Sequence, residues 1–201
     1  MEGPALIVID VQNDFCPGGS LPVAHGDEII PKINAVVRVF RRAALPMFFT
    51  RDWHPRNHCS FMSQGGEWPP HCIKDTLGAE FHRGLVVPPG ARIISKATRS
   101  DAEAYSGFQG TRLAKDLQDL KVRELFVGGL ATDYCVKNTV LDALGAGFTA
   151  YILSDCLKGV NLKRTDSATA TRVMVARGAK PITSKGAIRR MSRRVAVLSS
   201  S

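Results

Sequence analysis

The stretch Val127-Gly128-Gly129-Leu130-Ala131-Thr132-Asp133-Tyr134-Cys135-Val136 decides how the rest of the sequence is interpreted. The apolar run at residues 124–127 predicts a buried parallel strand, and the residues after the stretch carry apolar side chains at helical spacing. The glycine pair permits a tight turn, and Thr132 or Asp133 is a suitable N-cap for the helix. The stretch therefore predicts a strand, a turn and a helix.

Cys135 falls in the first turn of this predicted helix. Unpaired N–H groups and the helix dipole at that position favour a thiolate and can hold a developing oxyanion. Taken alone, however, a cysteine at such a junction is more often a small buried residue without a chemical role. The other loops must decide between the two interpretations.

Composition is that of one soluble globular domain spanning residues 1–201. Apolar residues make up 44% of the chain and charged residues 22%. The first residues do not resemble a signal peptide, and no apolar run approaches membrane-spanning length, so we expect neither a secreted nor a membrane protein. The chain has five cysteines, an odd number without the spacing of a disulfide framework, so we expect reduced thiols and a cytoplasmic protein.

The net charge of +9 has a large contribution from basic residues between 158 and 194. A basic surface can bind nucleic acid or anionic membranes. No nucleic-acid-binding signature accompanies it, and aromatic residues are only 7%, so we expect a solvated surface that favours anionic ligands. Neither a membrane nor a nucleic acid is an expected partner, and the oligomeric state stays open. Residues 187–194 are the best candidate for an accessory patch.

Short strands alternate with helices along the chain. Apolar runs predict strands at residues 5–9, 46–50, 92–95, 148–153 and 179–183, besides the strand before Cys135. Helical spacing predicts helices at about residues 27–43 and 163–177, and a third that carries Leu113, Leu117 and Leu120. This alternation predicts an α/β fold, an open, doubly wound sheet with helices on both faces.

Four polar or reactive residues lie at the ends of four predicted strands: Asp10, Asp52, Lys96 and Cys135. Ligands bind outside the carboxyl ends of the strands in such sheets, so we expect the four side chains to meet there. Cys135 would attack a carbonyl, and Asp10 would take the thiol proton and pass it to a leaving amine. Lys96 would hold Asp10 ionised and lower the thiol pKa by roughly one unit or more.

A second group of polar residues lies in the loop of residues 53–78 and at its start. Asp52, His54 and His71 offer a carboxylate and two imidazoles, which suit Zn²⁺, Fe²⁺ or Mn²⁺. His58 and Ser60 are further candidate ligands. A closed structural zinc site that would use His58, Cys59, His71 and Cys72 is the alternative, but the spacings match no closed zinc module.

The sequence resembles the nicotinamidases of the isochorismatase-like (cysteine hydrolase) superfamily, in order and across nearly the whole chain. The matching motifs are Asp10-Val-Gln-Asn-Asp-Phe15, Asp52-Trp-His54-Pro-x-x-His58, Trp68-Pro-Pro-His71-Cys72, Lys96, Tyr105-Ser-Gly-Phe108 and Gly129-Leu-Ala131-Thr-Asp-Tyr-Cys135-Val. The resemblance implies a three-layer fold with a six-stranded parallel sheet of Rossmann-like form. It implies hydrolysis of nicotinamide to nicotinate and ammonia through a cysteine thioester, as part of NAD salvage.

The resemblance also assigns roles by position. Asp10, Lys96 and Cys135 match the catalytic triad, and Asp52, His54 and His71 match the ligands of one divalent metal ion, with Zn²⁺ as first choice. A cis peptide is implied at Leu130-Ala131. The backbone amides of Ala131 and Cys135 match the oxyanion hole, and the ring pocket is matched by Phe15, Trp68 and Tyr105.

In the family the metal binds the pyridine nitrogen, so it orients the ring and withdraws electrons from it. Whether His58, Ser60 or Glu67 joins the metal varies within the family and stays open here. Two other functions compete with nicotinamide hydrolysis. One is an amidase for another small amide, such as pyrazinamide or a carbamoyl compound. The other is a catalytically silent nucleic-acid binder that would not need Cys135.

Overall fold

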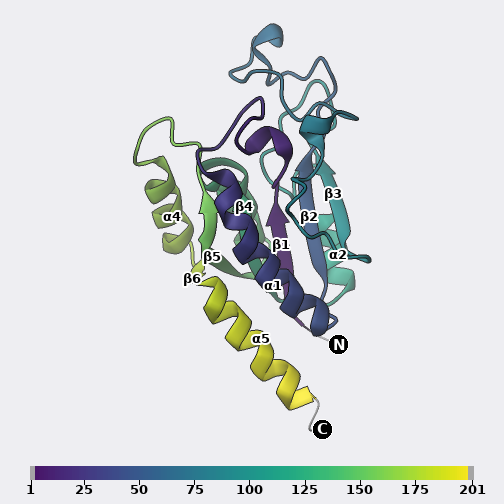
Figure 1. The fold of residues 1–201 in the computed structure, drawn as a ribbon, viewed down its shortest axis with the longest axis vertical. Helices are drawn as coiled ribbons and strands as arrows, with labels where there is room; N and C mark the ends of the chain where they lie inside the picture. Colours follow the sequence, from purple (N-terminus) through teal and green to yellow (C-terminus); the bar gives the residue numbers. More distant parts are fainter. Residues whose placement is uncertain (1–2, 199–201) are drawn as a thin grey trace.

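The computed structural model describes residues 3–198. Six parallel strands form one sheet in the spatial order β3-β2-β1-β4-β5-β6 (Figure 1). The strands are β1 (Ala5–Ile9), β2 (Met47–Asp52), β3 (Arg92–Lys96), β4 (Glu124–Leu130), β5 (Thr149–Lys158) and β6 (Lys180–Ile182). The chain builds outward from β1 to β3 and then returns to place β4 beside β1. The predicted six-stranded parallel sheet is confirmed, with its switch point between β1 and β4.

Helices cover both faces of the sheet, as predicted. The α-helices are α1 (Ile30–Arg42), α2 (Leu113–Asp119), α3 (Lys137–Gly145), α4 (Asp166–Ala176) and α5 (Ser184–Leu198). The shorter elements are the 3₁₀ turns η1 (Asn13–Phe15), η2 (Gly26–Ile29), η3 (Met62–Gln64) and η4 (Leu77–Ala79), and the π-helical turn η5 (Thr132–Val136). Buried side chains of α1 and α5 share one core, and those of α2, α3 and α4 share the other. No helix within residues 3–198 combines the length and the apolar character that crossing a membrane requires.

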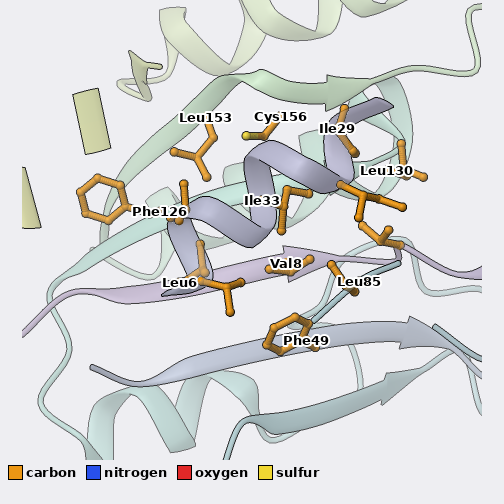
Figure 2. Close-up of a cluster of buried hydrophobic side chains, with 14 of the residues drawn as sticks. Leu6, Val8, Ile29, Ile33, Phe49, Leu85, Phe126, Leu130, Leu153 and Cys156 are labelled. Atoms are coloured by element: carbon orange, nitrogen blue, oxygen red, sulfur yellow. The ribbon is translucent and has the colours of Figure 1, made fainter. Parts of the chain in front are cut away.

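The core beneath α1 is built from aliphatic and aromatic side chains of alternate strand positions. Figure 2 shows Ile33 of α1 above Leu6 and Val8 of β1, all three almost completely buried. Phe126 of β4 stacks on Tyr151 of β5 with ring centroids 4.8 Å apart. Because β1 is covered on both faces, its five residues are all apolar, which is why the sequence run is continuous.

Helix α5 was missed by the sequence analysis, which placed only an accessory patch at residues 187–194. Ala187, Ile188 and Met191 have helical spacing and pack on the core, with Ala187 and Met191 buried. Four arginines lie between and after these apolar residues, so the sequence pattern indicates a charged segment and not an amphipathic helix.

The glycine pair of β4 does not form the predicted turn. The strand continues through both residues to Leu130, and the register with β5 shifts between Val127 and Gly129. Gly129 has a φ of +136°, and a Cβ there would lie 2.1 Å from the backbone oxygen of Ile9. The glycines are therefore required because neighbouring strands approach closely, and not because the chain reverses.

We expect Gly129→Ala to destabilise the fold severely, because the methyl group must displace the backbone of β1 and the φ is strained for alanine. The expected loss is more than ~3 kcal/mol in the free energy of unfolding, measured by urea denaturation. Gly145→Ala is the matched control, since a Cβ there meets nothing within 4 Å. It should change stability by less than ~1 kcal/mol. Equal effects of the two substitutions would contradict this account of β4.

Candidate active site

Asp10, Asp52, Lys96 and Cys135 meet at the carboxyl edge of the sheet, as predicted. Asp52 and Lys96 are register partners at the ends of β2 and β3, and Asp10 directly follows β1. The Lys96 Nζ lies 3.0 Å from Asp10 Oδ2, 2.5 Å from Asp52 Oδ1 and 3.4 Å from the Cys135 Sγ. One ammonium group therefore contacts both carboxylates and the thiol.

This cluster is buried, and its members are held by groups that the sequence analysis did not single out. Lys96 is 1% exposed and also donates to the carbonyl oxygen of Ala104. The Thr50 hydroxyl donates to Asp10 Oδ1 at 2.6 Å. Thr50 could have been found from the sequence, because it lies two residues before Asp52 on the same strand and so faces the same side of the sheet.

Burial and the neighbouring charges shift the pKa values of Asp10 and Lys96. Burial raises the pKa of Asp10 to about 6, with the Lys96 ammonium opposing that rise. Burial lowers the pKa of Lys96, but Asp10 and Asp52 outweigh it and the pKa lies well above its usual range. Lys96 therefore stays charged.

The prediction of a lowered pKa for Cys135 is wrong. Burial raises the pKa of the Cys135 thiol well above its ordinary value, although Lys96 opposes the rise. The physical reasons are the loss of solvation on burial and, after it, the carboxylates of Asp10 and Asp52, which raise the thiol pKa and already pair with Lys96. The resting side chain is therefore a thiol, and a nucleophilic role requires a neighbour that removes its proton.

The backbone around Cys135 forms the wide turn η5, which runs directly into α3. The predicted N-cap at Thr132 or Asp133 is wrong, because neither side chain caps the turn. The Asp133 carboxylate instead accepts hydrogen bonds from the backbone N–H groups of Val160 and Asn161. The implied cis peptide is present between Leu130 and Ala131.

Asp52, His54 and His71 converge beside the cluster. Each offers one atom that can bind a metal, and these three atoms lie within 4.8 Å of one another. The Nδ1 of His71 lies 2.8 Å from the Pro69 carbonyl oxygen, and the Nδ1 of His54 lies 3.3 Å from that of Ala97. Backbone oxygens therefore hold the Nδ1–H groups and leave both Nε2 atoms available as ligands.

Two further observations fit a metal ion to these residues. The His54 Nε2 is buried without a hydrogen-bond partner, and burial lowers the pKa of His54 to about 4, so the imidazole is neutral at pH 7. Burial raises the pKa of Asp52, but Lys96 and then His54 outweigh it, so its net pKa is lowered and the carboxylate is ionised. Its Oδ1 contacts Lys96, while its Oδ2 lies 3.8 Å from His54 Nε2. Asp52 thus joins the metal-binding group to the Lys96 cluster.

His58 lies next to this group without joining it in the structure. Its ring centroid is 4.1 Å from that of His54, but its Nδ1 contacts the Ser60 hydroxyl at 2.7 Å and its Nε2 contacts the Ala102 carbonyl at 3.2 Å. Both ring nitrogens are therefore engaged within the protein.

A pocket opens above Cys135 and is lined by aromatic side chains. Its lining includes Phe15, Trp68 and Tyr105, as the resemblance implied. It also includes Ala131, Cys135 and the three candidate metal ligands, Asp52, His54 and His71. The Trp68 Nε1 donates to the Tyr105 hydroxyl at 3.0 Å, which fixes the two rings. The sequence analysis missed four further lining residues: Leu21, Glu103, Tyr134 and Val160.

Two loop residues after β1, Gln12 and Asp14, hold the backbone of neighbouring segments in place. The Gln12 side chain accepts from the backbone N–H of Asp52 and donates to the Asp52 carbonyl. The Asp14 carboxylate accepts from the backbone N–H groups of Cys72 and Ser20. Both side chains thus tie the loop of β1 to the segments that carry Asp52 and His71. The sequence placed them within a matching motif but gave no role for either.

The arrangement matches a known family. Residues 4–186 match the model of the isochorismatase domain.

The chain belongs to the isochorismatase family.

Proteins similar to this chain include a nicotinamidase and a pyrazinamidase. The nicotinamidase of Escherichia coli is 38% identical over 200 residues, which cover 89% of this chain and 94% of that protein. A structure of the pyrazinamidase of Pyrococcus horikoshii in complex with zinc is 50% identical, covers 90% of this chain and 98% of its own, and superposes with a TM-score of 0.86. PnC1 of L. infantum, in complex with nicotinate, is 35% identical with a TM-score of 0.83 and covers 91% of this chain and 93% of its own.

Proposed function

We propose that this protein is a nicotinamidase, which hydrolyses nicotinamide to nicotinate and ammonia. The observation that carries the proposal is the position of Cys135. Its thiol lies within reach of Lys96, beside a metal-binding group and under an aromatic pocket. An aromatic wall suits a flat heteroaromatic ring, and a nucleophile at the pocket floor suits a carboxamide on that ring.

The reaction proceeds in two halves. Asp10 takes the thiol proton of Cys135, and the thiolate attacks the carboxamide carbon. The proton passes from Asp10 to the leaving nitrogen as the C–N bond breaks, which releases ammonia and leaves a thioester. Asp10 then takes a proton from water, which attacks the thioester, and the proton returns to the sulfur as nicotinate forms. The backbone N–H groups of Ala131 and Cys135 are proposed to hold the oxyanion.

Lys96 keeps the site electrostatically balanced during this cycle. Its ammonium faces Asp10, Asp52 and Cys135 at once, so it stabilises the carboxylate before proton transfer and the thiolate after it. Phe15, Trp68 and Tyr105 hold the ring and exclude water from its faces.

Asp52, His54 and His71 are proposed to hold one divalent ion, with zinc as first choice. The ion supplies Lewis acidity and a fixed anchor for a ring nitrogen. Two imidazoles and a carboxylate form a ligand set that zinc accepts. The five cysteines are all free, which fits a reducing compartment such as the cytoplasm, where we place a role in NAD salvage.

Pyrazinamide is the second candidate substrate, because it offers the same flat ring, ring nitrogen and carboxamide. The deciding experiment measures ammonia release from nicotinamide, pyrazinamide and a carbamoyl compound, before and after chelation, with elemental analysis of the purified protein. We expect metal-dependent turnover of nicotinamide. If the metal-loaded protein releases ammonia from none of these amides, the proposal is refuted.

We expect His71→Ala to lower the bound metal below one ion per chain and to raise the KM for nicotinamide, because one of three ligands is lost. Loss of supporting groups at metal sites typically costs ~10–100-fold in affinity, and loss of a ligand at least as much. Metal content is measured by elemental analysis after dialysis. His25→Asn is the control, since that imidazole is exposed and pairs only with Glu28. Equal metal content in the two variants would remove His71 from the site.

We expect kcat/KM to fall on the acidic side with a midpoint at about pH 6, because Asp10 must be ionised to accept the thiol proton and its pKa is raised to about 6. Above this pH the carboxylate is available, and below it activity should fall ~10-fold per pH unit. Metal content is determined at each pH, so that loss of the ion is not mistaken for protonation. A flat profile down to about pH 5 with metal retained would contradict the base role of Asp10.

A further inference from the structure

Two neighbouring helices hold all of the protein's net positive charge. Helices α1 and α5 contain nine of the 27 lysines and arginines and none of the 18 acidic residues. The remaining 18 basic residues are therefore balanced by the 18 acidic ones. The excess of +9 is not spread over the surface but belongs to one layer of the fold.

The two helices lie side by side on the same face of the sheet (Figure 1). Ala187 and Met191 of α5 are buried in the same core as Ile33 and Val37 of α1, so the opposite sides of both helices face solvent. Six exposed side chains make up what we call the basic face: Arg38, Arg41, Arg42, Lys185, Arg189 and Arg193.

The basic face is uncompensated. Among the side chains that the structure describes, none of the carboxylates forms a salt bridge with any of these six residues. Arg190 differs, because it pairs with Glu124 at 2.6 Å and lies over the Tyr151 ring, so it serves the fold. Six like charges on adjacent helices repel one another, and an anionic partner would relieve that repulsion.

The chemistry of the basic face selects one class of partner. Seven of the nine basic residues on the two helices are arginines, whose planar fork binds phosphate through paired hydrogen bonds. Among residues 3–194, whose side chains the structure describes, the large apolar side chains that are exposed all lie outside α1 and α5, so this part of the two helices offers no apolar anchor for insertion into a membrane. The one aromatic residue of the two helices, Phe40, is buried, so the face has no platform for unstacked bases.

We propose that the basic face is a second binding site, for the phosphate backbone of duplex nucleic acid, without sequence preference. The active-site pocket lies at the carboxyl ends of the strands, whereas α1 ends and α5 extends toward the opposite end of the sheet (Figure 1). The two sites can therefore be occupied independently. This inference departs from the expectation drawn from the sequence, because the sequence does not show that the two helices are neighbours or that their arginines lack partners.

The test measures fluorescence anisotropy of a labelled DNA duplex of about 20 base pairs as salt is varied. Six phosphate contacts predict that the logarithm of the binding constant falls with the logarithm of salt concentration at a slope of about −5. The patch variant carries four substitutions: Arg38→Gln, Arg41→Gln, Arg189→Gln and Arg193→Gln. Four lost contacts should reduce the slope to about −2 and weaken binding at low salt by more than ~100-fold.

A control variant with the same net charge separates the basic face from total charge. It removes four exposed positive charges elsewhere: Arg83→Gln, Lys121→Gln, Arg164→Gln and Arg177→Gln. Circular dichroism and ammonia release should be unchanged in both variants, since none of these residues lines the pocket. Duplex binding should be lost only in the patch variant.

Three results would overturn the proposal. The wild-type protein does not bind the duplex at low salt, or both variants weaken binding equally, or vesicles rich in phosphatidylserine bind in place of DNA. None of these results bears on nicotinamide hydrolysis, which the ammonia assay tests separately.

Discussion

Replacing Cys135 with alanine is expected to abolish ammonia release from nicotinamide while leaving the fold intact. The Sγ is the one candidate nucleophile that lies 3.4 Å from the Lys96 ammonium and lines the aromatic pocket. Without it no thioester can form, and water would have to attack an unactivated amide. Removal of a catalytic nucleophile typically costs ~10⁴-fold or more in kcat.

The decisive measurement combines turnover with binding. Alanine removes only a sulfur atom from a residue that is 5% exposed, so metal content and nicotinate affinity should stay near their wild-type values. Cys59→Ser is the matched control, because that thiol is free but does not line the pocket, and it should keep full activity. Ammonia release by Cys135→Ala at more than a small fraction of the wild-type rate would exclude the thioester mechanism.

Asp10→Asn is expected to reduce kcat/KM by more than ~10³-fold. General-base catalysis is worth ~10²–10⁴ on its own, and here the same carboxylate must also generate the thiolate. Because the pKa of Cys135 is raised by burial, the thiol cannot ionise unaided at neutral pH. Asparagine is the appropriate replacement, since Asp10 has a φ of +46° and asparagine tolerates that region better than alanine does.

A graded companion variant tests whether the loss comes from the base. Thr50→Val removes the hydroxyl that donates to Asp10 Oδ1, and that hydrogen bond lowers the Asp10 pKa. The variant should keep most activity near pH 8 and lose it at a higher pH than the wild type as the solution is acidified, because the Asp10 pKa rises. Near-normal kinetics of Asp10→Asn, or an unshifted acidic limb in Thr50→Val, would argue against Asp10 as the proton acceptor.

Much of the site could be predicted from the sequence, for a topological reason. Asp10, Asp52 and Lys96 each stand at the end of an apolar run, and parallel strands direct such ends to one edge of the sheet. The apolar runs alone locate the strands in the sequence. The convergence of these residues could therefore be predicted without knowledge of any distance. The candidate metal ligands were predictable as well, because Asp52 and His54 are separated by a single residue and His71 lies on the loop that follows them.

Other supporting groups could not be predicted in this way. Gln12 and Glu103 occupy ordinary positions in the sequence; Gln12 matters because it bonds to Asp52, 40 residues away, and Glu103 because it lines the pocket. The protonation of Cys135 was predicted wrongly for a related reason. Its pKa depends first on burial of the thiol and then on the two carboxylates that lie beside the Lys96 ammonium, and neither is set before the chain folds.

The amino-acid sequence by itself determined the α/β fold class. It also placed Asp10, Asp52, Lys96 and Cys135 at the carboxyl edge of the sheet, because periodicity and strand ends are local properties of the chain. Tertiary structure alone decided three things: that Gly129 serves strand packing, that Cys135 rests as a thiol, and that α1 and α5 join their charges into one face. Each of these depends on distances between atoms far apart in the chain. Sterics, desolvation and Coulomb interactions act through those distances, and no local pattern records them.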